Sequence, residues 1–140
     1  RERLGRAYAE AGVQAEVHAF IDDMGAADAR ADLVVCRAGA TTVAELTALG
    51  KAAILVPYPF AADDHQRANA AVLADHGAGI LILDAELTGE RLGAMVVELA
   101  KDRKRLMDME KAARELAVPD AVERVMQVCH EVVREGVHPR

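Results

Sequence analysis

Short apolar runs recur along this chain at intervals that leave room for about one helix between successive runs. They cover residues 13–20, 33–36, 52–56 and 79–83; the first alternates apolar and polar residues, and the others are apolar throughout. Parallel strands are joined by crossover helices, and strands covered on both faces are apolar along their length. The pattern therefore predicts an α/β fold, a Rossmann-like parallel sheet with flanking helices. Ligands bind such sheets at the carboxyl ends of the strands.

The segments between and after these runs have helical spacing and recognisable ends. Gly12, Gly50 and Gly77 follow three of them, and glycine is the usual residue after a helix. Asp22 is expected to cap a short helix, and Pro119 lies near the start of the last one, where a missing N–H costs little. We expect helices over residues 1–11, 22–29, 42–49, 63–76, 88–101, 104–116 and 120–134.

The composition excludes several classes of protein. The net charge is −6, which is the wrong sign for a nucleic-acid-binding surface. The spacing of Cys36 and Cys129 fits neither a disulfide framework nor a zinc site, so a reducing cytoplasm is the expected setting. Adjacent aspartates at 22–23 and 63–64 lack further ligands nearby, and we expect no metal and no cofactor. No apolar run approaches the roughly 20 residues of a membrane-spanning helix.

The first segment that points to chemistry is residues 36–45, with the sequence CRAGATTVAE. Here Gly39 permits a tight turn, and the helix that follows presents unpaired N–H groups and a positive dipole end, which suit a phosphate. Thr42 and Glu45 have the spacing of a capping box, in which Glu45 would bond back to the Thr42 backbone. Alternatively, the two oxygens of the Glu45 carboxylate would accept hydrogen bonds from adjacent ribose hydroxyls. The spacing leaves both interpretations open.

The second segment is residues 57–70, PYPFAADDHQRANA, a proline-rich loop that leads into a polar helix start. The Gln66 amide both donates and accepts, so it can bind neighbouring sugar hydroxyls. The alternative is ordinary helix N-terminal chemistry, with Asp63 and Asp64 near the positive end of the dipole. Histidine can act as a general base, but without a nucleophilic partner we expect His65 to have a capping or supporting role. We assign no catalytic residue.

Together these segments resemble glycosyltransferase family 28, and they follow one another in the family's order. The matching stretches are FIDDM at 20–24, ADLVVCRAGATTVAE at 31–45, DHQ at 64–66 with NA at 69–70, and VPDAVERV at 118–125. One such stretch would be weak support, whereas the ordered set is specific and covers nearly the whole chain.

The resemblance implies the C-terminal half of a GT-B enzyme, which binds the donor UDP-N-acetylglucosamine. Ile21 would contact the uracil through its backbone, and Glu45 would bind the ribose hydroxyls. Gln66 would bind the 3- and 4-hydroxyls of the sugar and so separate glucosamine from galactosamine donors. The residues that would line the diphosphate and sugar at the helix start are Ala40, Thr41, Thr42, Val43 and Ala44.

The reaction implied by the resemblance is an inverting displacement at the anomeric carbon of the sugar. The attacking group would be the 4-hydroxyl of N-acetylmuramic acid on lipid I, and the product would be lipid II of peptidoglycan synthesis. The helix start would oppose the negative charge that grows on the UDP leaving group, without a metal.

Two parts of the family's pattern are absent from this chain. One is the pair of opening strands with a glycine-rich phosphate loop; the other is the acceptor-binding half, which would hold the catalytic base. Residues 1–140 are therefore expected to be a partial donor-binding domain, with C-terminal helices at about 88–134, that is inactive alone. The protein would be cytoplasmic and peripheral on the inner face of the cell membrane, with contact to membrane and lipid I only through the missing half.

Three alternatives stay open. A non-catalytic UDP-N-acetylglucosamine-binding subunit of a split glycosyltransferase would start naturally near Arg1 and have a partner chain. A nucleotide-sugar epimerase on the same fold would need acid and base residues across the cleft, and none can be assigned. A purely structural domain would leave Glu45 and Gln66 as capping residues. The missing initiator Met and the missing first strands favour a fragment of a transferase over the first alternative.

Overall fold

The computed structural model describes residues 2–135. The chain divides into two compact units, Arg1–Arg30 and Ala31–Arg140. Every fully buried apolar side chain that the structure describes belongs to the second unit, which also contains the sheet. Among residues 2–135, no helix is both long and apolar enough to cross a membrane.

The first unit consists of two helices joined by irregular chain. These are α1 (Glu2–Glu10) and α2 (Met24–Arg30). The Ala26 N–H donates to Asp23 Oδ1 at 2.8 Å, so the side chain that caps α2 is that of Asp23. The expectation that Asp22 caps this helix was therefore wrong by one residue.

The strand expected at residues 13–20 is not formed, and this segment is irregular chain. A strand is stable only when a neighbour pairs its N–H and C=O groups. The described part of the first unit has two helices and no strand that could serve as that neighbour. Most apolar residues of this segment are consequently exposed, among them Val13 and Phe20.

The second unit is built on a three-stranded parallel sheet in the order β1-β2-β3. The strands are β1 (Val34–Cys36), β2 (Ala53–Leu55) and β3 (Gly79–Leu81). Ile54 at the centre of β2 lies opposite Val35 of β1 and Ile80 of β3. Three of the four expected strands are thus confirmed, each shorter than its apolar run.

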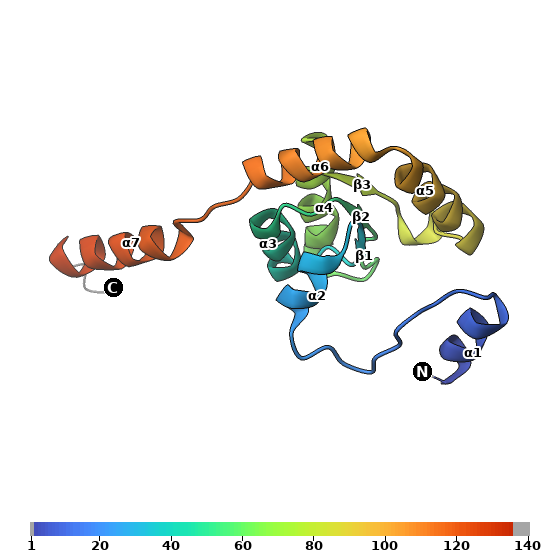
Figure 1. The fold of residues 1–140 in the computed structure, drawn as a ribbon. Helices are drawn as coiled ribbons and strands as arrows, with labels where there is room; N and C mark the ends of the chain where they lie inside the picture. The colour runs from blue at the N-terminus through green and yellow to red at the C-terminus, as the bar shows by residue number, and fades with distance from the viewer. Residues whose placement is uncertain (1, 136–140) are drawn as a thin grey trace. The chain divides into compact units, whose positions relative to one another are not determined.

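Helices follow the strands in alternation and then continue to the end of the described chain (Figure 1). They are α3 (Ala40–Leu49), the short 3₁₀ helix η1 (Ala62–Asp64), α4 (His65–Asp75), a second 3₁₀ helix η2 (Asp84–Glu86), α5 (Gly89–Lys101), α6 (Arg103–Glu115) and α7 (Ala121–Glu135). The three C-terminal helices begin and end within about one residue of their expected positions, because cap residues mark their ends in the sequence.

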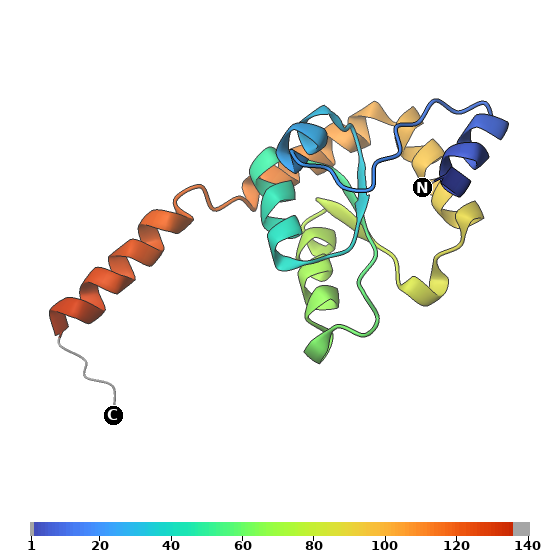
Figure 2. The ribbon, with the colours of Figure 1, turned by 90° about the horizontal axis from the view of Figure 1, so that it is seen from below.

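Each face of the sheet has its own core, which explains why the strands are apolar throughout. Ala53 and Leu55 of β2 pack on one side with residues of α3, α4 and α6. Ile54 points to the other side and packs with Leu99 of α5 and Leu106 of α6. Adjacent residues of a strand point to opposite faces, so β2 joins the two cores. The α/β architecture with helices on both faces is confirmed (Figure 2).

Candidate functional site

Three loops leave the sheet at the carboxyl ends of its strands, where ligands bind in parallel sheets. The chain runs from β1 into α3, from β2 through η1 into α4, and from β3 into η2. The residues predicted to bind diphosphate, ribose and sugar lie on the first two of these connections. Because the strands are parallel and adjacent, these connections emerge at the same edge of the sheet.

The start of α3 is open. Gly39 is the N-cap with extended backbone (φ −63°, ψ 150°), and no side chain caps the helix. The Val43 N–H donates to the Gly39 carbonyl at 2.9 Å. The N–H groups of Ala40, Thr41 and Thr42 precede that bond, and such groups have no partner within a helix. The helix therefore presents backbone donors and the positive end of its dipole at the sheet edge.

Glu45 lies one turn further along α3 and is exposed. Because α3 begins at Ala40 rather than at the expected residue 42, Thr42 lies inside the helix and is not its cap. The capping-box interpretation of Thr42 and Glu45 is therefore wrong. In the part of the chain that the structure describes, the Glu45 carboxylate has no hydrogen bond or ion pair. All of its acceptor positions are open to a ligand.

The other predicted residues of α3 differ in what they can offer. Ala40, Thr41 and Ala44 are exposed, and Thr42 is half-buried. Val43 packs against the core between β2, α3 and α4, so its side chain serves the fold. For these residues, contact with a ligand would come mainly from the backbone at the helix start, and it stays a prediction.

Gln66 lies in the first turn of α4, half-buried, and its amide is held by the loop after β2. The Tyr58 N–H donates to Gln66 Oε1 at 2.9 Å. The Gln66 Nε2 group keeps its two donor hydrogens for another partner. Gln66 is thus bound to the fold through one end of its amide and open at the other.

Two neighbours of Gln66 on α4 connect the site to its surroundings. Asn69 Nδ2 donates to the Ala38 carbonyl at 3.1 Å and so joins α4 to the loop that precedes α3. His65 Nδ1 donates to the Ala62 carbonyl at 2.6 Å, which agrees with the supporting role expected for this histidine. The starts of α3 and α4, and with them the Ala40–Glu45 segment and Gln66, are therefore tied together.

The loop between β2 and α4 ends in two residues with left-handed backbone. Asp63 has φ 49° and Asp64 has φ 53°, a conformation that aspartate adopts more readily than most residues. The helix expected from residue 63 consequently begins at His65, after the turn of η1. Within residues 2–135, no three His, Cys, Asp or Glu side chains gather as a metal site would require.

Arg37 and Asp84 belong to this edge of the sheet and were not singled out from the sequence. Arg37 follows β1, Asp84 begins η2 after β3, and Arg37 Nη1 lies 2.6 Å from Asp84 Oδ1. The same nitrogen donates to the carbonyls of Val56 and Pro57 after β2. The one available signal was position, because each residue lies just beyond the carboxyl end of a strand.

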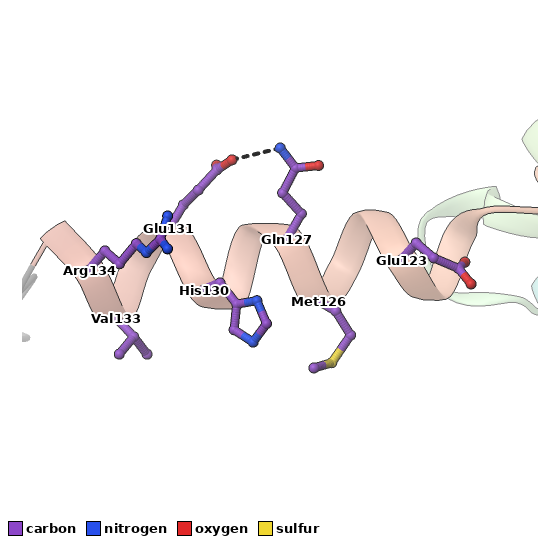
Figure 3. Close-up of a pocket in the computed structure, with 7 residues that line it drawn as sticks. All are labelled: Glu123, Met126, Gln127, His130, Glu131, Val133 and Arg134. Atoms are coloured by element: carbon purple, nitrogen blue, oxygen red, sulfur yellow. Dashed lines mark hydrogen bonds between the residues drawn. The ribbon is translucent and has the colours of Figure 1, made fainter.

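Ile21, predicted to contact uracil, is in the first unit, in the loop before α2, and is partly exposed. The other seven predicted substrate-binding residues are in the second unit. A hollow on the surface of α7 contains none of these eight residues. It runs along one side of α7, and all its lining residues come from that single helix, so it is not enclosed (Figure 3).

The sequence from residue 2 to residue 125 matches the glycosyltransferase family 28 C-terminal domain, and the chain belongs to that family. Among its curated relatives is the UDP-N-acetylglucosamine–N-acetylmuramyl-(pentapeptide) pyrophosphoryl-undecaprenol N-acetylglucosamine transferase of Aromatoleum aromaticum, 56% identical over 131 residues that cover 94% of this chain and 36% of the relative. The enzyme of the same name from a Geobacter species is 54% identical, over 89% of this chain and 33% of the relative.

A solved structure, MurG of Acinetobacter baumannii, superimposes with a TM-score of 0.86 at 40% identity, covering 93% of this chain and 40% of that one. The chain thus spans about a third of the length of the curated relatives that it matches. The resemblance to family 28 and the expected fold class are both confirmed.

Proposed function

We propose that this chain is the donor-binding part of an inverting glycosyltransferase that transfers N-acetylglucosamine from UDP-N-acetylglucosamine. The observation that carries the proposal is the open start of α3, with the unpaired Glu45 carboxylate one turn beyond it and the Gln66 amide at the start of α4, which Asn69 joins to the loop before α3. The relatives named as N-acetylglucosamine transferases support the same donor.

Each group of the donor has a chemical counterpart among these residues. The N–H groups of Ala40–Thr42 and the dipole of α3 suit the diphosphate, whose negative charge grows as UDP leaves. The carboxylate of Glu45 can accept from both ribose hydroxyls, and the Nε2 group of Gln66 can donate to the oxygens of the sugar hydroxyls. Ile21 would contact the uracil through its backbone.

The acceptor and the location belong to the same proposal. The printed names of the relatives describe an acceptor with an N-acetylmuramyl-pentapeptide on pyrophosphoryl-undecaprenol, which corresponds to lipid I. We infer that the sugar is transferred to its N-acetylmuramic acid 4-hydroxyl, giving lipid II, on the inner face of the cell membrane. Acceptor and membrane would be bound by a part of the enzyme outside this chain.

The test is a titration of the chain with UDP-N-acetylglucosamine, UDP-N-acetylgalactosamine and UDP, followed by amide NMR. Shifts should concentrate at residues 40–45 and at Gln66, and the gluco donor should bind more tightly than the galacto donor. Glu45→Gln removes the charge but keeps the shape, so it should weaken all three ligands by roughly 10- to 100-fold, since hydrogen bonds to a charged group contribute about 1.5–3 kcal/mol.

The matched control is Glu90→Gln, because Glu90 is also exposed near a helix start, on α5, and is not among the residues predicted to bind the donor. It should leave all three affinities unchanged. If the folded chain shows no shift at residues 40–45, or if Glu45→Gln and Glu90→Gln behave alike, the donor-site assignment is wrong.

A further inference from the structure

The Arg37 side chain connects the carboxyl ends of all three strands. It follows β1 directly, and its Nη1 donates to the Pro57 carbonyl at 3.1 Å and to the Val56 carbonyl at 3.3 Å, both after β2. The same nitrogen lies 2.6 Å from the Asp84 carboxylate after β3. About half of the Arg37 side chain is exposed. If Arg37 contributed only a positive charge to the surface, it would not need the hydrogen bonds to these two carbonyls.

One of these contacts continues to Gln66 through a single peptide group. The Pro57 carbonyl and the Tyr58 N–H belong to the same planar unit, and the chain has no cis peptide bond among its described residues. Arg37 binds the carbonyl, and Gln66 Oε1 accepts from the N–H at 2.9 Å. In a trans peptide these two groups point in opposite directions, so fixing one fixes the other. The guanidinium also lies 5.7 Å from the centre of the Tyr58 ring.

The direction of the Tyr58 N–H determines which end of the Gln66 amide faces outward. An N–H can be satisfied only by an acceptor, so the oxygen of the amide must turn toward Tyr58. The Nε2 group is then left as a pair of donors for a ligand. If the peptide group rotated, this preference would be lost and Gln66 could present either end.

We propose that Arg37, held by Asp84, is a positioning residue for recognition of the donor sugar. Through the Pro57–Tyr58 peptide group it fixes the Gln66 amide with Nε2 toward the sugar hydroxyls. It acts through Gln66 and need not touch the donor. This inference rests on the proposed function. It assigns the discrimination between gluco and galacto donors to Gln66 together with the residues that position it, rather than to Gln66 alone.

The test uses Arg37→Met, which keeps the aliphatic length and removes the donors. In the ligand-free chain, hydrogen exchange of the Tyr58 amide should become about five- to tenfold faster, the effect of losing one ordinary hydrogen bond. The ratio of UDP-N-acetylgalactosamine to UDP-N-acetylglucosamine dissociation constants should fall by a similar factor. The affinity for UDP, which lacks the sugar, should not change.

The matched control is Arg91→Met. Arg91 is exposed to a similar extent and forms a comparable ion pair with Glu86, at 2.8 Å, but does not contact the Pro57–Tyr58 peptide group. It should change neither the exchange rate nor the ratio. Asp84→Asn, which weakens the hold on Arg37 without removing its donors, should give an intermediate effect. Asp84→Asn also tests the proposal if Arg37→Met fails to fold.

Several outcomes separate this inference from the proposed function. If the unaltered chain does not distinguish the two donors, the proposed function fails and there is no specificity for Arg37 to set. If the unaltered chain does distinguish them but the ratio survives in both Arg37→Met and Asp84→Asn, the positioning role is wrong. Unchanged exchange of the Tyr58 amide in ligand-free Arg37→Met would also overturn it, whatever the donors do.

Discussion

Gly50 occupies a backbone position that other residues adopt only under strain. It is the C-cap of α3, with φ 63° and ψ 54°, and a Cβ added there would overlap Cγ of Arg114 on α6. Gly77 follows His76, the C-cap of α4, and has a similar φ of 72°, but nothing lies within 4 Å of its Cβ position. Substitutions at these two glycines therefore distinguish the effect of backbone strain from the effect of crowding.

Gly50→Ala should therefore destabilise the chain more than Gly77→Ala does. We expect about 1 kcal/mol for Gly77→Ala from the left-handed backbone, and roughly 2–3 kcal/mol for Gly50→Ala, where Arg114 must also move. Urea denaturation measures both free energies of unfolding. Adding Arg114→Ala to Gly50→Ala should recover the excess; equal losses in the two single variants would show that crowding has no effect.

Asn69 is the residue that ties α4 to the loop before α3. The carbonyl that it binds belongs to Ala38, which is fully buried. Asn69→Ala leaves this carbonyl without its donor and should cost about 1–3 kcal/mol of unfolding free energy. Asn69→Asp, which has a similar shape but presents only acceptors when ionised, should be at least as destabilising at neutral pH. Thermal denaturation of the unaltered chain and the two variants measures these losses. An unchanged midpoint for both variants would contradict the prediction.

At the scale of elements, the ends of the C-terminal helices are set by local side chains. Thr88 Oγ1 accepts from the Arg91 N–H at 3.1 Å at the start of α5, and Asp102 Oδ1 accepts from the Arg105 N–H at 2.9 Å at the start of α6. Both helices contribute to the core that contains Ile54. Fraying at either start would therefore loosen the packing on one face of the sheet.

Replacement of the cap of α5 tests this directly. Thr88→Ala removes the acceptor and should lower the free energy of unfolding by about 1 kcal/mol. Thr88→Ser keeps an oxygen in place and should lose much less. Denaturant titration followed by circular dichroism measures both, and equal losses would mean that the methyl group of Thr88, and not its hydroxyl, supports the helix.

At the scale of the whole molecule, the residues that form the hydrophobic cores and one residue of the proposed site, Ile21, belong to different units. The sheet and both cores lie within Ala31–Arg140, whereas Ile21 lies within Arg1–Arg30. The described residues of α1 bury no side chain. The first unit therefore has little apolar burial of its own to contribute to folding.

A chain that begins at Ala31 should keep its cooperative thermal unfolding, with a midpoint within a few degrees of that of the whole chain. It should bind UDP more weakly if Ile21 contacts the uracil, while inorganic diphosphate, which has no base, should bind as before. Scanning calorimetry and titration calorimetry give the two results. Loss of the unfolding transition would show that the first unit is needed for the core, and unchanged UDP affinity would remove Ile21 from the site.

The sequence alone determined the elements whose signals are local. Three strands could be predicted because a buried parallel strand must be apolar along its length. The C-terminal helices could be predicted because residues such as Thr88 and Pro119 mark their ends within one turn. The family was also predictable, because several short motifs in a fixed order identify it where no single motif would.

The tertiary structure decided what depends on residues distant in the sequence. Residues 13–20 alternate as a strand does, but alternation does not supply the neighbour that a strand needs. Glu45 had the spacing of a capping box with Thr42. Only the start of α3 at Ala40, before Thr42, shows that this capping box does not form. The partners of Arg37 lie 19 and 20 residues away at Val56 and Pro57, because the order of the strands, and not any local pattern, brings β1 and β2 side by side.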